Sequence, residues 1–205
     1  MNLPEVAFKN ISFGFVNESI LDGFSFQAPA GRHTVLKGES GSGKSTMLQL
    51  ILGFYQPKEG HVLIDGQPRQ PRVVRKQSAW LPQDLDLGDD SVRNVMLRPF
   101  DFAANQSQKP SEAQLEKYLQ RLGLGADNLD KAFRDLSTGQ RQRVGLAVCS
   151  LLDKSLLLLD EPTSALDAAS KRKVAELLLD SKRTIISTSH DPFWVERADR
   201  LIELD

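Results

Sequence analysis

The sequence predicts an α/β fold with a mostly parallel sheet, an N-terminal antiparallel β region and an inserted helical region. Three observations support this class. A glycine-rich turn, Gly38–Thr46, links an apolar pair to a helix-like segment. The uniformly apolar run Leu156–Leu159 is typical of a strand buried on both faces. Strand-like and helix-like segments alternate after the turn, which favours a parallel sheet with ligand sites at the carboxyl ends of its strands.

The N-terminal segments predict strands. Residues Val6–Phe15 and Ile20–Ala28 alternate imperfectly between apolar and polar types, and with His61–Gly66 they could form an antiparallel sheet. Phe13 and Phe15 flank Gly14, and one of them could be exposed to stack on a base. An isolated aromatic residue in a strand is more often part of the core.

The turn matches the pattern G-x-x-x-x-G-K-[ST] of a phosphate-binding loop, in which glycines let the backbone N–H groups curl around an anion. Lys44 is expected to reach the β- and γ-phosphates, and the Ser45 hydroxyl is expected on Mg²⁺. A helix that opens at Gly43 or Lys44 and continues to Phe54 would point its positive dipole end at the phosphates. The loop consists of Gly38, Glu39, Ser40, Gly41, Ser42, Gly43, Lys44, Ser45 and Thr46.

The middle of the chain predicts mainly helices. A short strand, Ser78–Leu81, ends at Pro82-Gln83, a helix is expected over Ser91–Leu97, and Phe100–Lys109 reads as a loop. Ser111 and Gln114 form a capping box before apolar residues at helical spacing. The apolar face of that helix needs a partner, so residues 84–150 are expected to form a helical subdomain within a single domain spanning 1–205.

The last third carries an adjacent pair of carboxylates at the end of an apolar run. The segment Leu136–Gln140 precedes a helix expected from about Arg141 to Leu152. Asp160 and Glu161 follow the apolar strand, and burying two carboxylates is costly unless they face a cation or water. They predict the second half of a phosphoryl-transfer site, with one acid for Mg²⁺ and one for the attacking water.

The remaining elements complete the sheet. Asp167 can cap a helix that runs to about Ser181, and a buried strand, Thr184–Ser189, ends at His190. Asp191-Pro192 begins a short helix, and Arg200–Leu204 is the expected final strand. At a strand end, a histidine is by default a satisfied structural residue.

Composition limits the class of function. The net charge of −1 weighs against a general nucleic-acid surface. One cysteine, Cys149, lies in an apolar segment and reads as a core residue, which fits a reducing compartment. No run approaches the roughly 20 apolar residues of a membrane helix, and no signal peptide is expected, so a membrane role would come through a partner. A basic cluster, read as a solvated loop face, consists of Arg69, Arg72, Arg75 and Lys76.

Taken together and in order, these motifs resemble those of the ATP-binding subunit of an ABC (ATP-binding cassette) transporter. The likeness spans nearly the whole chain, and each short motif apart from the phosphate loop would be weak without the others. The matching segments are the Walker A loop Gly38–Thr46, the Q-loop Gln83, the signature Leu136–Gln140, Walker B Leu156–Glu161, the D-loop Ser164–Asp167 and the switch residue His190.

The resemblance implies a composite site, in which ATP on one subunit is covered by the signature of a second, giving a twofold dimer that is expected to be a homodimer. It implies that Phe15 stacks on adenine and that Glu161 polarises water. His190 would hold the γ-phosphate and Glu161 in register. The metal ligands would be Ser45 and Asp160, with Gln83 sensing metal and γ-phosphate, and the groups acting across the dimer would be Ser137, Gly139 and Gln140.

Two positions depart from the family pattern. Thr138 stands where the signature usually has a glycine, which puts a β-branched side chain near the partner's nucleotide. Val148 replaces a common arginine, and no physical effect follows from the sequence. The chain ends soon after the last expected strand, so the additional C-terminal regulatory domains of some importers are not expected.

Three functions compete. The first is a transport motor on the cytoplasmic face of the inner membrane, driving separate integral membrane subunits by ATP-dependent dimerisation. The second is a soluble ABC ATPase acting on ribosomes or DNA, which usually has two cassettes or a long coiled coil; neither is present here. The third is a P-loop kinase or GTPase, which would need an acceptor site or a guanine-reading Asn-Lys-x-Asp element. The sequence has no such element. Cargo and direction are not predicted.

Overall fold

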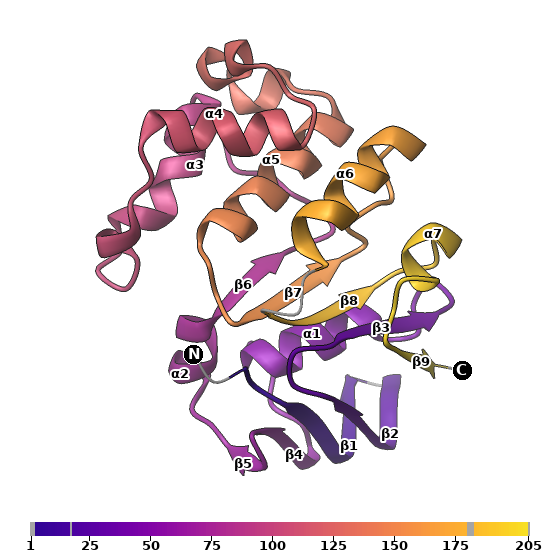
Figure 1. The fold of residues 1–205 in the computed structure, drawn as a ribbon. Helices are drawn as coiled ribbons and strands as arrows, with labels where there is room; N and C mark the ends of the chain where they lie inside the picture. The colour runs from indigo at the N-terminus through magenta and orange to yellow at the C-terminus, as the bar shows by residue number, and fades with distance from the viewer. Residues whose placement is uncertain (1–2, 17, 180–182, 205) are drawn as a thin grey trace. The chain divides into compact units, whose positions relative to one another are not determined.

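The computed structural model describes residues 3–16, 18–179 and 183–204 (Figure 1). Contacts divide the chain into two compact units. The first contains residues 1–80, 154–161 and 181–205, and the second contains residues 81–153 and 162–180. The second unit covers the expected helical region, 84–150, and also a later segment. The single domain over 1–205 stays a prediction.

The first unit begins with an antiparallel sheet, as predicted. Its strands are β1 (Val6–Phe15), β2 (Glu18–Ala28), β4 (Glu59–Ile64) and β5 (Gln67–Pro68), in the order β2-β1-β4-β5. The strand expected at His61–Gly66 thus starts two residues earlier, and Asp65 and Gly66 take positive φ angles in the turn beyond it.

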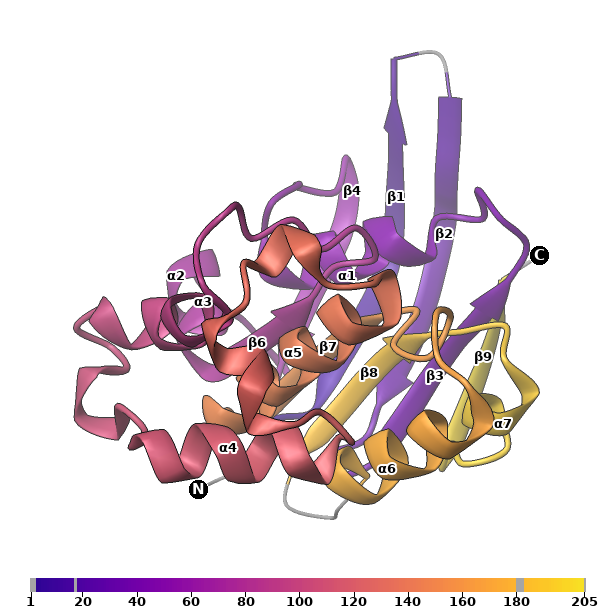
Figure 2. The same cartoon turned by 90° about the horizontal axis from the view of Figure 1, so that it is seen from above.

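A second sheet has the order β6-β7-β8-β3-β9, and the pairs β3–β8, β3–β9 and β7–β8 are parallel (Figure 2). All residues of β7 and β8 are buried, as the apolar runs predicted. The strands of this sheet lead into the segments that form the candidate site. Its strands are β3 (His33–Gly38), β6 (Ser78–Leu81), β7 (Leu156–Asp160), β8 (Thr184–Thr188) and β9 (Arg200–Leu204).

Three helices belong to the first unit. The helix α1 (Lys44–Leu52) follows the phosphate loop, and α7 (Pro192–Val195) follows His190. The third, α2 (Pro71–Gln77), corrects the reading of the basic cluster as a loop. Arg72, Arg75 and Lys76 lie on this helix. Pro71 occupies its first position, and Val74 is buried in the core.

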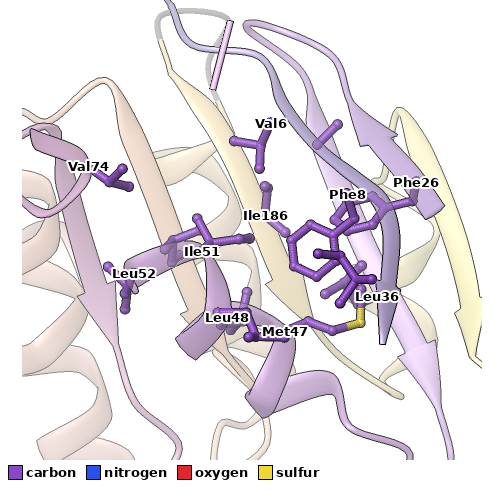
Figure 3. Close-up of a cluster of buried hydrophobic side chains, with 14 of the residues drawn as sticks. Val6, Phe8, Phe26, Leu36, Met47, Leu48, Ile51, Leu52, Val74 and Ile186 are labelled. Carbon is purple, nitrogen blue, oxygen red and sulfur yellow. The ribbon is translucent and has the colours of Figure 1, made fainter. Parts of the chain in front are cut away.

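The core of the first unit lies where α1 meets strands of both sheets (Figure 3). Phe8 and Phe26 contact each other with ring centroids 4.7 Å apart. Leu36, Met47 and Ile186 are fully buried in the same cluster. The helix behind the phosphate loop is therefore fixed by packing on several strands, which gives the loop a rigid base.

The second unit is helical. Its α-helices are α3 (Val92–Leu97), α4 (Glu112–Arg121), α5 (Thr138–Leu151) and α6 (Ala168–Leu178). Short 3₁₀ turns lie at Arg98–Asp101, Gln106–Gln108, Ala126–Asp130 and Phe133–Asp135. Gln106–Gln108 falls in the expected loop Phe100–Lys109, and Arg98–Asp101 overlaps its start, where Phe100 is buried.

The caps of these helices follow the sequence signals, with one correction. Ser111 forms the expected capping box on α4, and Asp167 caps α6. The helix expected from Arg141 begins at Thr138, because Ser137 caps it and Gly139 is accommodated in its first turn. The predicted end of α6, near Ser181, lies outside the described residues.

Candidate functional site

The phosphate loop connects β3 to α1 with the backbone that its glycines allow. Gly41 and Gly43 both have φ of 89°, and Gly43 caps the helix. A Cβ added at Gly43 would lie 2.4 Å from Cγ2 of Ile20, and one at Gly38 would lie 2.6 Å from Oγ of Ser42. Both the φ angles and the close contacts therefore require glycine in this loop.

Lys44 begins α1 and folds over the loop. Its Nζ donates hydrogen bonds to the carbonyl oxygens of Gly38 at 2.9 Å and Glu39 at 2.5 Å. Ser45 and Thr46 follow in the first helical turn and are half-buried. The lysine, two hydroxyls and the amino end of α1 thus cluster at one point, an arrangement suited to an anion.

The register of the parallel sheet brings the acidic pair and His190 to the same edge as the phosphate loop. Leu36 on β3 pairs with Thr188 on β8, and Thr188 pairs with Asp160 on β7. These residues form one row across three neighbouring strands. The phosphate loop, the acidic pair and His190 each begin within two residues of this row, because parallel strands end at a common edge.

The acidic pair is buried and held by Thr188. Asp160 is 5% exposed and Glu161 is 7% exposed. The Thr188 hydroxyl donates to Oδ1 of Asp160 at 2.6 Å and accepts the backbone N–H of Glu161 at 2.9 Å. Glu161 also has a φ of 48°, an unusual angle for a residue other than glycine, and residues with such strained backbones cluster at active sites.

His190 contacts the second acid of the pair. Its Nδ1 lies 3.0 Å from Oε1 of Glu161, and the His190 side chain as a whole is 73% exposed. The imidazole also borders a hollow of about 910 Å³, which we call the phosphate-loop hollow. Its lining comprises Lys37, Gly38, Glu39, Ser40, Ser42, His190, Glu203 and Leu204.

The aromatic candidate of the first strand is Phe15. It is 45% exposed, whereas Phe13 is 7% exposed and belongs to the core. Phe13 and Tyr55 contact the Phe15 ring, with centroids 5.3 and 5.4 Å away. The exposed ring is therefore held in place by two others, and Tyr55 is a contact that the sequence reading missed.

The second unit brings Gln83 and the signature together. Gln83 is exposed and lines a cavity of about 250 Å³ with Thr138 and Arg141 of α5 and with Ser164 and Ala165 of the D-loop. Gln142, which the sequence analysis did not single out, ties the D-loop to α5. Its amide donates to Oγ of Ser164 at 3.5 Å and accepts the backbone N–H of Ala165 at 3.3 Å.

The signature residues form the first turn of α5. Ser137 and Gln140 make a reciprocal capping box, with bonds of 3.3 Å from Gln140 N–H to Ser137 Oγ and 2.9 Å from Ser137 N–H to Gln140 Oε1. A Cβ at Gly139 would lie 2.6 Å from the carbonyl oxygen of Ala165. Ser137 and Thr138 are exposed. Because these residues belong to the second unit, their placement against ATP stays a prediction.

Arg143 fastens this turn to its surroundings. The guanidinium donates to the carbonyl oxygen of Gly139 at 3.1 Å and to those of Leu122 and Gly123 at 3.1 and 3.3 Å. Burial lowers the pKa of Arg143, and the charge of Asp167 opposes this shift. A hydrogen bond from the backbone of Ser170 lowers the pKa of Asp167 in turn.

Comparison with known proteins gives consistent matches over most of the chain. A family model described as ABC transporter matches residues 21–164. The ATP-dependent lipid A-core flippases of Haemophilus influenzae (strain 86-028NP) and Escherichia coli (strain K12) are 34% and 32% identical to it, over 97% and 98% of this chain.

A solved structure, that of a bacterial Atm1-family ABC exporter with ATP bound, superposes with a TM-score of 0.88 and 31% identity over 98% of this chain. The chain spans 36% of the length of these flippases and 37% of that exporter. Among the described residues, we find no helix with the length and apolar character needed to span a bilayer.

Proposed function

Because the chain belongs to the ABC transporter family and corresponds to its nucleotide-binding domain, we propose that it binds and hydrolyses ATP to drive transport through integral membrane subunits. The row of Leu36, Thr188 and Asp160 carries this proposal. Because these three residues lie side by side near the ends of their strands, a phosphate-binding loop, an acidic pair and a histidine would face one nucleotide at this edge of the sheet.

The nucleotide would bind along the first unit. Phe15, exposed and braced by Phe13 and Tyr55, would stack on adenine. The amides of residues 38–46 would surround the phosphates, and Lys44 would exchange its carbonyl partners for the β- and γ-phosphate oxygens. A triphosphate competes well for this lysine because its bonds to the cation are charge-assisted.

The residues present also fit Mg²⁺. Asp160 is buried, and within the described ranges no basic side chain forms an ion pair with it. A carboxylate in that setting needs a cation or further donors. Ser45 and Asp160 would supply oxygen ligands that Mg²⁺ prefers, with the phosphates completing its shell. Gln83 belongs to the second unit, so its role as a further metal ligand stays a prediction. The bound ion would neutralise charge that develops on the β- and γ-phosphate oxygens.

Hydrolysis would depend on Glu161 and His190. The carboxylate would accept a proton from the attacking water, and His190, bonded to Oε1 of Glu161, would hold that carboxylate in position beside the γ-phosphate. Thr188 donates to Asp160 and accepts from the backbone of Glu161, so it fixes the two acids relative to each other. This buried framework pre-orients the groups before ATP arrives.

A second copy of the chain would complete the site. Ser137, Gly139 and Gln140 lie at the amino end of the 14-residue helix α5, where N–H groups and the helix dipole favour a phosphate. If two copies associate head to tail with twofold symmetry, each signature faces the nucleotide of its partner. The proposed assembly is therefore a homodimer with two ATP molecules at its interface.

Transport is favoured over a soluble role on ribosomes or DNA. The relatives are named as a lipid A-core flippase and an ABC exporter. The net charge of −1 also gives no attraction to nucleic acid. We therefore place the chain at the cytoplasmic face of the inner membrane, bound to membrane subunits of unspecified cargo.

The experiment is the substitution Glu161→Gln, followed by phosphate release and equilibrium ATP binding in Mg²⁺. Loss of the base should lower kcat about 10²-fold or more and leave ATP affinity nearly unchanged. Glu203→Gln is the matched control, since this exposed carboxylate lines the phosphate-loop hollow and pairs with Lys37 at 3.2 Å. Equal turnover in the wild-type and Glu161→Gln proteins would refute the role of Glu161.

A further inference from the structure

A buried polar cluster lies beside the site and has no part in the chemistry described so far. It consists of His33 on β3, Ser187 on β8 and Trp194 on α7, which are 5%, 0% and 0% exposed. Nε1 of Trp194 donates to Oγ of Ser187 at 2.9 Å, and the same Oγ lies 2.9 Å from Nε2 of His33. Nδ1 of His33 lies 3.1 Å from the carbonyl oxygen of Arg197.

With a neutral His33 ring, the donors and acceptors of this cluster fix one arrangement of protons. The indole N–H of Trp194 can only donate, so Ser187 Oγ accepts it and directs its own proton to Nε2 of His33. The carbonyl of Arg197 can only accept, so Nδ1 of His33 carries the ring proton. Both ring nitrogens of the neutral His33 are satisfied in this arrangement. Burial lowers the pKa of His33, in the direction that this arrangement requires.

The rings add packing to these bonds. His33 and Trp194 meet edge to face, with centroids 5.2 Å apart and an interplanar angle of 70°. The backbone N–H of His33 also donates to Oδ2 of Asp199 at 2.8 Å. Strand β3 is thus joined through side chains to β8 and to both α7 and the segment that follows it.

The cluster brackets His190 in the chain. Ser187 precedes His190 by three residues, and Trp194 follows it by four. The imidazole of His190 is 73% exposed and meets Glu161 at 3.0 Å. Its position therefore depends on the buried residues that hold the chain on either side of it.

We propose that Ser187, His33 and Trp194 are positioning residues that keep His190 in register with Glu161. The triad acts by holding α7 against β8, so that the turn that carries His190 cannot shift. This inference rests on the proposed function, because it assigns the triad a role in ATP turnover. Ser187 contributes most, since one hydroxyl bonds both other members.

The test is Ser187→Ala in the full chain, assayed by phosphate release. This substitution leaves the indole N–H without its acceptor and His33 Nε2 without its donor. We expect kcat to fall about tenfold through misplacement of His190, while the KM for ATP changes less than about twofold because the phosphate loop is untouched. The NMR resonances of the His190 ring should shift.

Thr34→Val is the matched control. Thr34 neighbours His33 on β3, is 0% exposed, and its hydroxyl finds no hydrogen-bond partner among the described residues. This variant removes a buried hydroxyl from the same sheet without breaking the triad, so kcat and the His190 resonances should stay as in the wild type. An equal loss of kcat in both variants would overturn the proposal.

A double mutant separates positioning from general damage. If Ser187 acts through His190, Ser187→Ala should lower kcat little further in a His190→Ala background. The same tenfold loss in both backgrounds would overturn the proposal. Should Ser187→Ala not fold, Trp194→Phe replaces it, since it keeps an aromatic ring and removes the N–H donor.

The outcomes distinguish this inference from the proposed function. A wild-type chain that releases no phosphate would contradict the ATPase, and the His190 resonances of Ser187→Ala would still decide whether the triad positions that ring. An active wild type with unchanged kcat and unchanged His190 resonances in a folded Ser187→Ala variant would overturn the triad alone.

Discussion

The acidic edge of the parallel sheet and the first turn of α5 are held by different means. Asp160 and Glu161 are 5% and 7% exposed and are bonded by Thr188, a residue 28 and 27 positions away. Ser137 is exposed and exchanges bonds with Gln140, three positions away. The first arrangement depends on the sheet, and the second on one helical turn.

This difference suits the two proposed roles. The two acids have to be held rigidly before ATP arrives, because misplaced charge lowers turnover steeply. The signature has to present its groups outward to a second copy, so a local cap that leaves Ser137 exposed is sufficient. Two experiments test this contrast, and a third concerns the neighbouring His33; they follow from the largest expected effect to the smallest.

Thr188→Val should break the acidic edge. Its hydroxyl serves both acids, so its loss leaves an acceptor and an N–H group unsatisfied, at a cost of about 1–3 kcal/mol in the free energy of unfolding. We expect kcat to fall about ten- to a hundredfold. Urea unfolding and phosphate release measure the two effects. Thr34→Val is the control. Similar losses of kcat and unfolding free energy in both variants would contradict a specific role of Thr188 in holding the two acids.

Ser137→Ala should separate capping from function. Ser111 makes the same capping box on α4, so Ser137→Ala and Ser111→Ala should each cost about 1 kcal/mol in unfolding free energy. We expect the first to lower ATP turnover several-fold, since each hydrogen bond to a charged phosphate is worth about 1.5–3 kcal/mol. The second should leave turnover unchanged. Equal turnover in the two variants would mean that Ser137 is purely a cap.

The smallest effect concerns pH. Burial holds the pKa of His33 below its ordinary value, while the carbonyl of Arg197 and the charge of Asp199 oppose that shift. The unfolded chain therefore binds more protons below about pH 6.5, so the free energy of unfolding should fall as pH decreases through the folded pKa. Urea midpoints at several pH values measure this, and His33→Gln should weaken the dependence. The same pH dependence of the urea midpoint in the wild type and in His33→Gln would exclude His33 as its source.

Local signals account for much of what could be read from the sequence. The capping box at Ser111, the buried strands at Leu156 and Thr184 and the glycine-rich loop all appear where the pattern put them. These signals succeed because each depends on residues within one or two turns of chain. The family match adds an independent confirmation of the class.

The errors share a cause. The basic cluster interpreted as a loop lies on α2, which has no N-cap side-chain bond and is held by the burial of Val74 and by a hydrogen bond from Arg75 to the carbonyl oxygen of Leu52. The helix expected from about Arg141 begins three residues earlier, at Thr138, because Ser137 caps it and Gly139 leaves room for the carbonyl oxygen of Ala165. In both cases a tertiary contact outweighed local propensity.

The sequence by itself determined the phosphate loop, the identity of most strands and helices, and the family. The tertiary structure decided that β8 lies between β7 and β3, which brings Thr188 to both acids and Ser187 to His33. The reason is physical. Strand order depends on how the whole chain packs, and residues more than 20 positions apart leave no periodic signal that would reveal their contact.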